Sequence, residues 1–227
     1  MYHRILLKIS GEALSSENAA LCRQTISATA EKLVKLQQRG IQIGVVVGGG
    51  NILRGRSAEG MERNRADHMG MLATAINALA LQDALEARGA SCVTLSAVEM
   101  QRFCDTYSAR AAKAHLEAGR IVIFACGSGS PFFSTDTAAA LRAAEIDADV
   151  LMLAKNVDAV YSADPKIDPN AQRYQRLTYD KVIADDLHAT DLTAITLCKE
   201  QHIPIHVFAL EEILSVFEKE GIGTFIS

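Results

Sequence analysis

The sequence predicts an α/β protein, a three-layer α/β/α sandwich built on an open, mainly parallel central sheet. Two observations support this prediction. Short runs of consecutive apolar residues alternate with longer segments of helical periodicity through the first two thirds of the chain. Apolar runs without polar alternation are typical of strands buried on both faces of a parallel sheet. In addition, hydrophobic residues make up 49% of the 227 residues, which suits a core covered by two helical layers.

The first part of the chain alternates strands and helices in a regular order. We expect strands at residues 5–9, 41–47, 93–95, 121–124 and 150–153, and helices near residues 25–38, 67–87, 108–117 and 135–146. Each helix is long enough to connect two parallel strands across one face of the sheet. This order therefore predicts consecutive βα units.

After residue 155 the expected elements become shorter. Residues 157–161 predict one strand of a short hairpin, and the Asp- and Pro-rich residues 162–169 predict a loop. We then expect helices near 179–184, 191–200 and 211–218, a strand at 205–208 and an edge strand at the C-terminal end. No segment has the composition of a flexible linker. We therefore expect one domain, residues 1–227, with two halves at about 1–150 and about 151–227.

Composition and charge argue against several classes of protein. The formal net charge of −4 gives the surface as a whole no attraction for nucleic acid or for an anionic membrane. No apolar run approaches the roughly 20 residues that span a bilayer, and a strand-like run occupies the place of a signal peptide. The five cysteines are scattered without a Cys-x-x-Cys pair, as expected for buried, reduced thiols. We expect a cytoplasmic protein without a membrane or nucleic-acid partner.

The most informative segment is a loop rich in glycine and serine that leads into an Ala-rich helix. It follows the apolar residues 121–126 and reads Gly127-Ser-Gly-Ser-Pro-Phe-Phe-Ser-Thr-Asp136. Backbone N–H groups and the helix dipole favour an anion at the N-terminus of a helix. Ser134, Thr135 and Asp136 add hydroxyl groups and a carboxylate at the same place. The segment therefore predicts a binding site for a phosphate group.

Two further loops combine glycines with cationic side chains. Lys8 lies in the first strand just before Gly11, and a lysine in a buried strand indicates an anionic partner. A lysine that extends its ammonium group to solvent explains this position equally well. The glycines of Gly48-Gly-Gly50 permit close approach of the backbone to a ligand, and Arg54 can bind phosphate oxygens in a bidentate manner. A tight structural turn is the alternative for these glycines.

Two other segments leave alternatives open. Asp67 begins the helix expected near residues 67–87, where it fits an N-cap and equally a ligand of ribose hydroxyl groups. Lys155 ends a strand, and Tyr161 and Asp164 flank the Pro-rich loop that follows. Such a loop can hold a purine ring against the aromatic side chain, and an ordinary hairpin fits the same residues.

Because the carboxyl ends of parallel strands lie at one edge of a sheet, these loops are expected to come together. They would supply lysines, an arginine, backbone N–H groups and the carboxylates of Asp136, Asp149 and Asp164. Positioning and charge neutralisation of this kind are what phosphoryl transfer requires. No Ser-His-Asp order and no His/Cys metal spacing competes with this interpretation.

Five segments resemble the bacterial uridylate (UMP) kinase family of the amino acid kinase superfamily, in the same order along almost the whole chain. They are Lys8-Ile-Ser-Gly-Glu-Ala-Leu14, Gly48-Gly-Gly-Asn-Ile-Leu-Arg-Gly55, Asp67-His-Met-Gly-Met-Leu-Ala-Thr74, Pro131-Phe-Phe-Ser-Thr-Asp-Thr-Ala-Ala-Ala-Leu-Arg142 and Asp191-Leu-Thr-Ala194. The resemblance implies the amino acid kinase fold, with an acceptor half at about 1–150 and a nucleotide-donor half at about 151–227. It implies transfer of the γ-phosphoryl group from MgATP to UMP, giving UDP for pyrimidine nucleotide biosynthesis.

The resemblance also implies roles for individual residues. The catalytic residues would be Lys8, Arg54 and Asp136. The ATP-binding residues would be Lys8, Ile9, Ser10, Gly11, Gly50, Arg54, Lys155, Asn156, Tyr161 and Asp164. The UMP-binding residues would be Gly49, Asp67, Ser128, Gly129, Ser130, Pro131, Phe132, Phe133, Ser134 and Thr135, with Asp67 on the ribose. Asp149 and Asp191 would be further functional acids. Mg²⁺ would arrive with ATP and not at a separate protein site, and the enzyme would be a homohexamer with GTP and UTP as effectors.

Several positions depart from the family pattern. Residues 15–22 replace a Gly-Phe-Gly-like segment, Ser130 stands where Asn is usual, and Thr190 stands where a larger apolar residue commonly precedes the aspartate. Lys155 and Asn156 are both candidates for one role in nucleotide binding. These changes affect the flexible loop, the base contacts and regulation more than the reaction.

Two competing functions follow from the same fold. Another kinase of the superfamily, acting on aspartate, glutamate or carbamate, would share the ATP half and differ in the acceptor half. The segments around Asp67 and Asp136 favour a nucleotide acceptor. A non-catalytic nucleotide-binding regulator is expected to lack charged groups such as Lys8, Arg54 and Asp136, and all of them are present. The sequence therefore favours catalysis.

Overall fold

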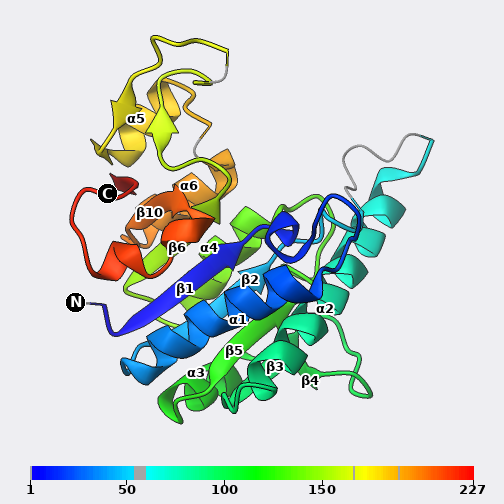
Figure 1. Ribbon diagram of the computed structural model, residues 1–227. Helices are drawn as coiled ribbons and strands as arrows, with labels where there is room; N and C mark the ends of the chain where they lie inside the picture. Colours follow the sequence, from blue (N-terminus) through cyan, green and yellow to red (C-terminus); the bar gives the residue numbers. More distant parts are fainter. Residues whose placement is uncertain (1, 54–59, 166, 189) are drawn as a thin grey trace.

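The computed structural model describes residues 2–53, 60–165, 167–188 and 190–227. Its strands are β1 (Arg4–Ile9), β2 (Gln42–Val47), β3 (Cys92–Ser96), β4 (Asp105–Thr106), β5 (Ile121–Ala125), β6 (Val150–Lys155), β7 (Val160–Tyr161), β8 (Arg173–Tyr174), β9 (Arg176–Leu177), β10 (Ile205–Ala209) and β11 (Thr224–Ile226). A nine-stranded sheet with the order β4-β3-β5-β2-β1-β6-β10-β11-β9 forms the centre (Figure 1). Its strands pair in parallel except for β10 with β11, and β7 and β8 form a separate antiparallel pair.

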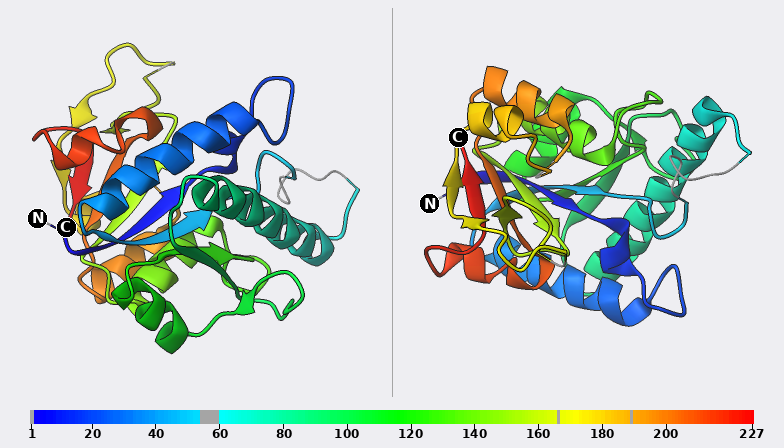
Figure 2. Two further views of the ribbon diagram at one scale, coloured as in Figure 1. Left: turned by 60° about the horizontal axis from the view of Figure 1, so that its bottom comes forward. Right: turned by 90° about the horizontal axis from the view of Figure 1, so that it is seen from above.

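Helices cover both faces of the sheet, which gives three layers (Figure 2). One face packs against α1 (Arg23–Gln38), α2 (Arg63–Glu86) and the 3-10 turns η1 (Gly11–Leu14), η3 (Leu210–Glu212) and η4 (Ser215–Phe217). The other face packs against α3 (Ala109–Glu117), α4 (Thr135–Glu145), α5 (Tyr179–Ala184) and α6 (Leu192–Glu200). Among the described residues, no helix combines the length and the apolar character needed to cross a membrane.

The apolar strands fill two cores at once. In β1, Ile5 and Leu7 pack in the core on the α1–α2 face, whereas Leu6 packs in the core that includes α4 and α6. All three side chains are fully buried. Because successive strand residues point to opposite faces, a strand covered on both sides carries apolar residues at successive positions, as at Ile5, Leu6 and Leu7. The predicted three-layer α/β architecture with a mainly parallel sheet is confirmed.

The long helix α2 begins earlier than predicted. We expected it near residue 67, but it starts at Arg63 because Glu62 caps it. The Glu62 carboxylate accepts hydrogen bonds from the backbone N–H groups of Asn64, at 3.0 Å, and Arg65, at 3.2 Å. Glutamate is an uncommon N-cap residue, so the sequence pattern pointed to the wrong acid. Asp67 lies within the first turns of the helix and is not its cap.

The prediction of a helix near residues 211–218 is wrong. This segment forms the short 3-10 turns η3 and η4 instead. An isolated helix of eight residues has little stability of its own, so tertiary packing decides its backbone. Ile213 is fully buried here, and Leu214, Val216 and Phe217 pack partly buried against the same core. The segment therefore takes the conformation that places these side chains on the sheet.

Candidate active site

The loops predicted to carry chemistry follow the carboxyl ends of neighbouring strands. β1 lies between β2 and β6 in the sheet, and β5 lies next to β2. Lys8 and Ile9 end β1 beside the end of β2 and the Leu153–Ala154 end of β6. Figure 1 shows β1 pointing towards the turn η1, next to the loop that follows β2. The parallel register thus brings together segments that are far apart in the sequence.

A buried carboxylate with two lysine partners lies at the centre of this edge. Lys8 Nζ is 2.6 Å from Asp136 Oδ1, and Lys155 Nζ is 3.2 Å from Asp136 Oδ2. The Thr190 hydroxyl donates a hydrogen bond of 2.8 Å to the same Oδ2. Side-chain exposure is 11% for Lys8 and 14% for Asp136. Lys8 is therefore a buried, paired lysine, which excludes the alternative of an ammonium group extended into solvent.

The charge state of Asp136 follows from these contacts. Burial by itself raises the pKa of a carboxyl group, but the charges of Lys8 and Lys155 outweigh this effect. Together with the hydrogen bond from Thr190, they hold the pKa of Asp136 well below its ordinary value. The group is thus a carboxylate at neutral pH. A group that is so difficult to protonate is suited to orient cations and not to remove a proton.

The loop before α4 adopts an unusual backbone conformation. Cys126 has φ 62°, Gly127 has φ 58°, Gly129 has φ 81° and Phe132 has φ 72°. Left-handed conformations at non-glycine residues such as Cys126 and Phe132 are strained and occur often at functional sites. The buried Arg142 of α4 donates a hydrogen bond of 3.2 Å to the carbonyl oxygen of Gly127. This contact ties the loop to α4.

The helix end that follows this loop is partly capped by the protein itself. Ser134 Oγ accepts hydrogen bonds from the backbone N–H groups of Asp136, at 3.0 Å, and Thr137, at 3.1 Å. The prediction that these helix N–H groups are free to bind an anion is wrong for these two donors. Ser134 is the N-cap residue of α4, a common use of serine at this position.

A cavity of about 480 Å³, called here the loop cavity, lies between this loop, the glycine-rich loop and α2. It is lined by Gly49, Gly50, Leu53, Asp67, Gly70, Met71, Thr74, Gly127, Ser128, Ser130, Phe133, Ser134 and Thr135. The Asp67 carboxylate accepts hydrogen bonds from Phe132 N, at 2.9 Å, and Arg63 Nε, at 2.8 Å. The cavity therefore contains many of the residues that the sequence assigned to an acceptor.

Close packing explains the glycines after β2. A Cβ atom on Gly49 would lie 2.8 Å from the carbonyl oxygen of Gly70 in α2. A Cβ atom on Gly11 would lie 2.7 Å from the carbonyl oxygen of Gly48. Both distances are shorter than real Cβ contacts, so the two loops and α2 can approach only without side chains at these positions. Arg54 and Gly55 lie outside the described residues.

A buried amide that sequence reasoning missed holds this glycine-rich loop. Asn77 of α2 is fully buried, and its Nδ2 donates to the carbonyl oxygen of Gly48 at 2.6 Å and to Asn51 Oδ1 at 2.7 Å. Asn51 Nδ2 in turn donates to the carbonyl oxygen of Ala20 at 2.6 Å. Because α2 contains other polar and charged residues, the sequence around Asn77 does not set it apart, and its role follows only from these contacts.

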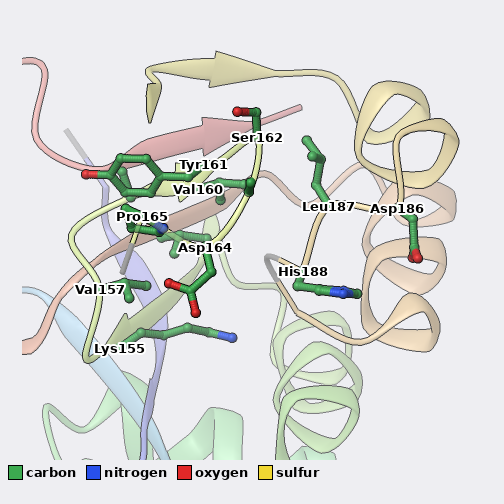
Figure 3. A pocket seen from close by; sticks show the side chains of 13 residues that line it. Lys155, Val157, Val160, Tyr161, Ser162, Asp164, Pro165, Asp186, Leu187 and His188 are labelled. Atoms are coloured by element: carbon green, nitrogen blue, oxygen red, sulfur yellow. The ribbon is translucent and has the colours of Figure 1, made fainter. Parts of the chain in front are cut away.

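A second cavity of about 450 Å³, called here the hairpin cavity, lies beside β7 and the Pro-rich loop (Figure 3). It is lined by Lys155, Val157, Ala159, Val160, Tyr161, Ser162, Ala163, Asp164, Pro165, Asp186, Leu187, His188 and Val207. In Figure 3 the side chains of Lys155 and Asp164 lie on one side of this cavity and His188 lies opposite. His188 had no sequence motif to identify it.

The two neighbours Lys155 and Asn156 have separate partners. Lys155 pairs with Asp136, as described above. Asn156 Nδ2 donates a hydrogen bond of 2.8 Å to Glu12 Oε2 in η1. Tyr161 donates from its hydroxyl group to Asp158 Oδ1 at 2.8 Å, and Asp158 also contacts Arg173 at 3.1 Å. Lys155 is thus the member of the pair that reaches the buried carboxylate.

Two predicted acids do not join this cluster. Asp149 lies at the amino end of β6, whereas the cluster lies at the carboxyl end, and its Oδ2 accepts from the backbone N–H groups of His3 and Arg4 at 2.6 and 2.9 Å. Asp191 is the N-cap of α6 and accepts from Ala194 N at 2.8 Å and from Thr137 Oγ1 at 2.7 Å. The Ser134 hydroxyl also donates to Asp191. Asp149 fixes the start of β1, and Asp191 joins the N-termini of α4 and α6.

Comparison with known proteins identifies a matching family and several similar structures. The model of the amino acid kinase family matches residues 3–209. The structure is similar to that of UMP kinase from Ureaplasma parvum, with 38% identity, a TM-score of 0.94 and coverage of 100% of this chain and 99% of that chain. For UMP kinase from Bacillus anthracis the values are 33%, 0.95, 100% and 96%. For uridylate kinase from Archaeoglobus fulgidus they are 29%, 0.75, 98% and 99%.

Proposed function

The chain belongs to the amino acid kinase family, and we propose that it transfers the γ-phosphoryl group of ATP to UMP, giving ADP and UDP. One observation carries this proposal: two cavities are linked through Asp136. Thr135 lines the loop cavity, Lys155 lines the hairpin cavity, and Asp136 follows Thr135 and pairs with Lys155. The similar UMP kinases extend over the full length of this chain. UDP formed in this way would serve pyrimidine nucleotide biosynthesis.

The loop cavity is the proposed site for UMP and the hairpin cavity is the proposed site for the adenosine part of ATP. In the loop cavity, Asp67 would accept hydrogen bonds from the ribose hydroxyl groups, and the loop from Ser128 to Thr135 would surround the nucleotide. In the hairpin cavity, Tyr161 and Asp164 would contact the adenosine. The donor phosphates would lie between the two cavities, at Lys8, Ser10, Gly11 and Gly50.

The proposed reaction needs no general base. The nucleophile is an oxygen of the UMP phosphate, which is largely ionised at neutral pH because the second pKa of a phosphate monoester is about 6. The barrier comes from bringing two polyanions together, so cationic groups at the junction lower it. Lys8 and Lys155 supply this charge, and Asp136 holds both ammonium groups in place. From the family resemblance, Arg54 would contribute a further positive charge.

Mg²⁺ is the metal expected for this reaction, and the residues around Asp136 fit its delivery with ATP. Both oxygens of Asp136 already contact lysines, so this carboxylate is engaged as an orienting group and not as a metal ligand. Mg²⁺ keeps several waters and commonly binds substrate phosphates. The ion would neutralise phosphate charge when it is bound, while the lysines orient the same phosphates.

The protein is proposed to act in the cytoplasm as a homohexamer regulated by GTP and UTP. Its five cysteines are free thiols, which supports a reducing compartment. Its net charge of −4 supports a function without nucleic-acid or membrane partners. One face of α2 supports assembly, because Met69, Leu72 and Ile76 are 40%, 55% and 47% exposed at helical spacing. An apolar stripe of this kind commonly lies at an interface between proteins.

Assembly through α2 predicts a mass change. Leu72→Glu combined with Ile76→Glu should place four like charges across a two-fold contact of this face and lower the mass of the particle in light scattering. Ile183→Glu, the same change on the 37% exposed Ile183 of α5, is the control and should leave the mass unchanged. An unchanged mass for the α2 double variant would remove this face from the proposed interface.

The activity is tested by measuring ADP release from MgATP with UMP, CMP, dUMP, aspartate and glutamate offered separately. We expect turnover with UMP, for which the loop cavity is the proposed site. UDP identified by chromatography would establish the transfer. Turnover with an amino acid alone would contradict the assignment of the acceptor. Binding of UMP and ATP without turnover would point to a regulator.

A further inference from the structure

Thr190 provides a third contact to Asp136, beside those of the two lysines. Asp136 Oδ1 faces Lys8 at 2.6 Å, whereas Oδ2 faces both Lys155, at 3.2 Å, and the Thr190 hydroxyl, at 2.8 Å. The carboxylate is therefore held from three directions. Without Thr190, each oxygen of Asp136 would have one lysine as its partner. The carboxylate could then rotate and exchange its two oxygens between the lysines.

The residue that follows Thr190 is anchored to the helix that carries Asp136. The next residue, Asp191, caps α6 through Ala194 N and accepts hydrogen bonds from Thr137 and Ser134 at the start of α4. Ser134 also caps α4 by accepting from Asp136 N at 3.0 Å. The hydroxyl of Thr190 is thus delivered by a backbone that is anchored at the same helix end.

This arrangement matters most when a nucleotide is present. A phosphate group near the junction attracts the ammonium group of Lys155, which is the longer and more exposed of the two lysine contacts at 3.2 Å and 23% exposure. Movement of Lys155 towards a phosphate would leave Oδ2 without a cation. If the Thr190 hydroxyl were missing as well, this buried oxygen would have no partner, which is unfavourable, and the carboxylate would turn to recover a contact. Such a rotation would also displace Lys8.

We propose that Thr190 is a positioning residue for phosphoryl transfer, acting through Asp136. Its hydroxyl keeps the carboxylate in one orientation while Lys155 engages phosphate, so that Lys8 stays aligned. The inference rests on the proposed kinase function. It extends that function by assigning a role to a side chain outside both cavities. The lysines carry charge to the substrates, and Thr190 fixes the group that aligns them.

The first test separates the hydroxyl group from the volume of the side chain. Thr190→Val removes the donor and keeps the shape, and Thr190→Ser keeps the donor. We expect Thr190→Val to lower kcat for UMP phosphorylation roughly tenfold while the KM values for UMP and MgATP change less than about twofold. Thr190→Ser should retain most of the wild-type kcat. Thr196→Val is the matched control, because Thr196 lies exposed on α6 and donates to the carbonyl oxygen of Leu192 at 2.9 Å.

Three results would overturn the inference. Thr190→Val could retain the wild-type kcat, Thr190→Ser could lose as much activity as Thr190→Val, or the change could appear only in KM. A wild-type protein without activity on UMP would instead overturn the proposed function. The experiment therefore distinguishes failure of the Thr190 proposal from failure of the proposed kinase function.

A second test does not depend on activity. Thr190→Val is introduced into the wild type and into Asp136→Asn, and the stability of the four proteins is measured by urea unfolding. If the hydroxyl acts on the carboxylate, Thr190→Val should destabilise the wild type clearly more than it destabilises the Asp136→Asn protein, because contacting residues show non-additive effects. Equal effects in both backgrounds would show that Thr190 acts elsewhere and would overturn the inference.

Discussion

Replacing Lys8 with methionine should lower kcat for UMP phosphorylation by roughly a hundredfold to a thousandfold, the loss typical when one preorganised electrostatic group is removed from a buried site. The side chain of Lys8, near the end of β1, is 11% exposed, and its ammonium group is 2.6 Å from Asp136. In this low-dielectric position its charge acts on the donor phosphates far more strongly than a surface lysine would. Methionine keeps the length and the apolar stem, so packing in β1 is preserved.

Steady-state kinetics with varied MgATP and UMP would measure this effect. Lys35→Met is the matched control, because Lys35 lies exposed on α1 and pairs at i,i+4 with the exposed Glu31, at 2.7 Å. We expect wild-type kinetics for that variant, since exposed pairs contribute little. A Lys8→Met protein that is folded and retains more than about half of the wild-type kcat would contradict the electrostatic role of Lys8.

The part of the site that could be predicted from the sequence consists of residues at strand ends and in loops with a local signature. Lys8 ends an apolar run, and Gly49 follows another, so the parallel topology alone brings their loops to one edge. Asp136 follows a glycine- and serine-rich loop at the start of a helix. The resemblance to UMP kinases rests on these same segments and agrees with the full-length structural similarity.

The residues that were missed act through tertiary contacts. Asn77 resembles any polar residue in a long helix until its contact with the Gly48 carbonyl oxygen is known. Arg142 reads as a surface arginine of an Ala-rich helix, yet its guanidinium is buried over the ring of Tyr107, at 3.9 Å, and bonds to the Gly127 carbonyl oxygen. Thr190 is 54 positions from Asp136 in the sequence. No local periodicity encodes partners at such separations.

The predicted acids also show that the sequence does not fix the partners of a side chain. Asp149 was expected to join the carboxylates of the loops, and the family resemblance implied a functional role for it. It lies at the amino end of β6, opposite to Lys155. Asp67 fitted two roles by sequence, and the cap formed by Glu62 removes one of them. The sequence identifies an acidic residue but not where its carboxylate points, because its partners come from other elements of the fold.

Asp136→Asn should lower the free energy of unfolding by about 3–5 kcal/mol at neutral pH, the cost of removing one partner from a buried ion pair. The substitution leaves Lys8 and Lys155 close together with no carboxylate between them, and both ammonium groups are largely buried, at 11% and 23% exposure. Urea unfolding of the two proteins measures the difference. Glu31→Gln is the control, because it removes an exposed acid that pairs with Lys35, and its unfolding curve should coincide with that of the wild type.

The difference between the wild type and Asp136→Asn should depend on pH in one direction. Burial opposes ionisation of Asp136, but the charges of Lys8 and Lys155 prevail and depress its pKa in the folded protein below the ordinary value of 3.8. A depressed folded pKa stabilises the protein at pH values above the unfolded pKa, and this stabilisation is lost as the pH falls towards the folded pKa. The difference should therefore be constant from neutral pH to about pH 5 and should shrink progressively below about pH 4. If the two stabilities fall in parallel below that pH, Asp136 does not carry the charge on which the proposed alignment of the lysines depends.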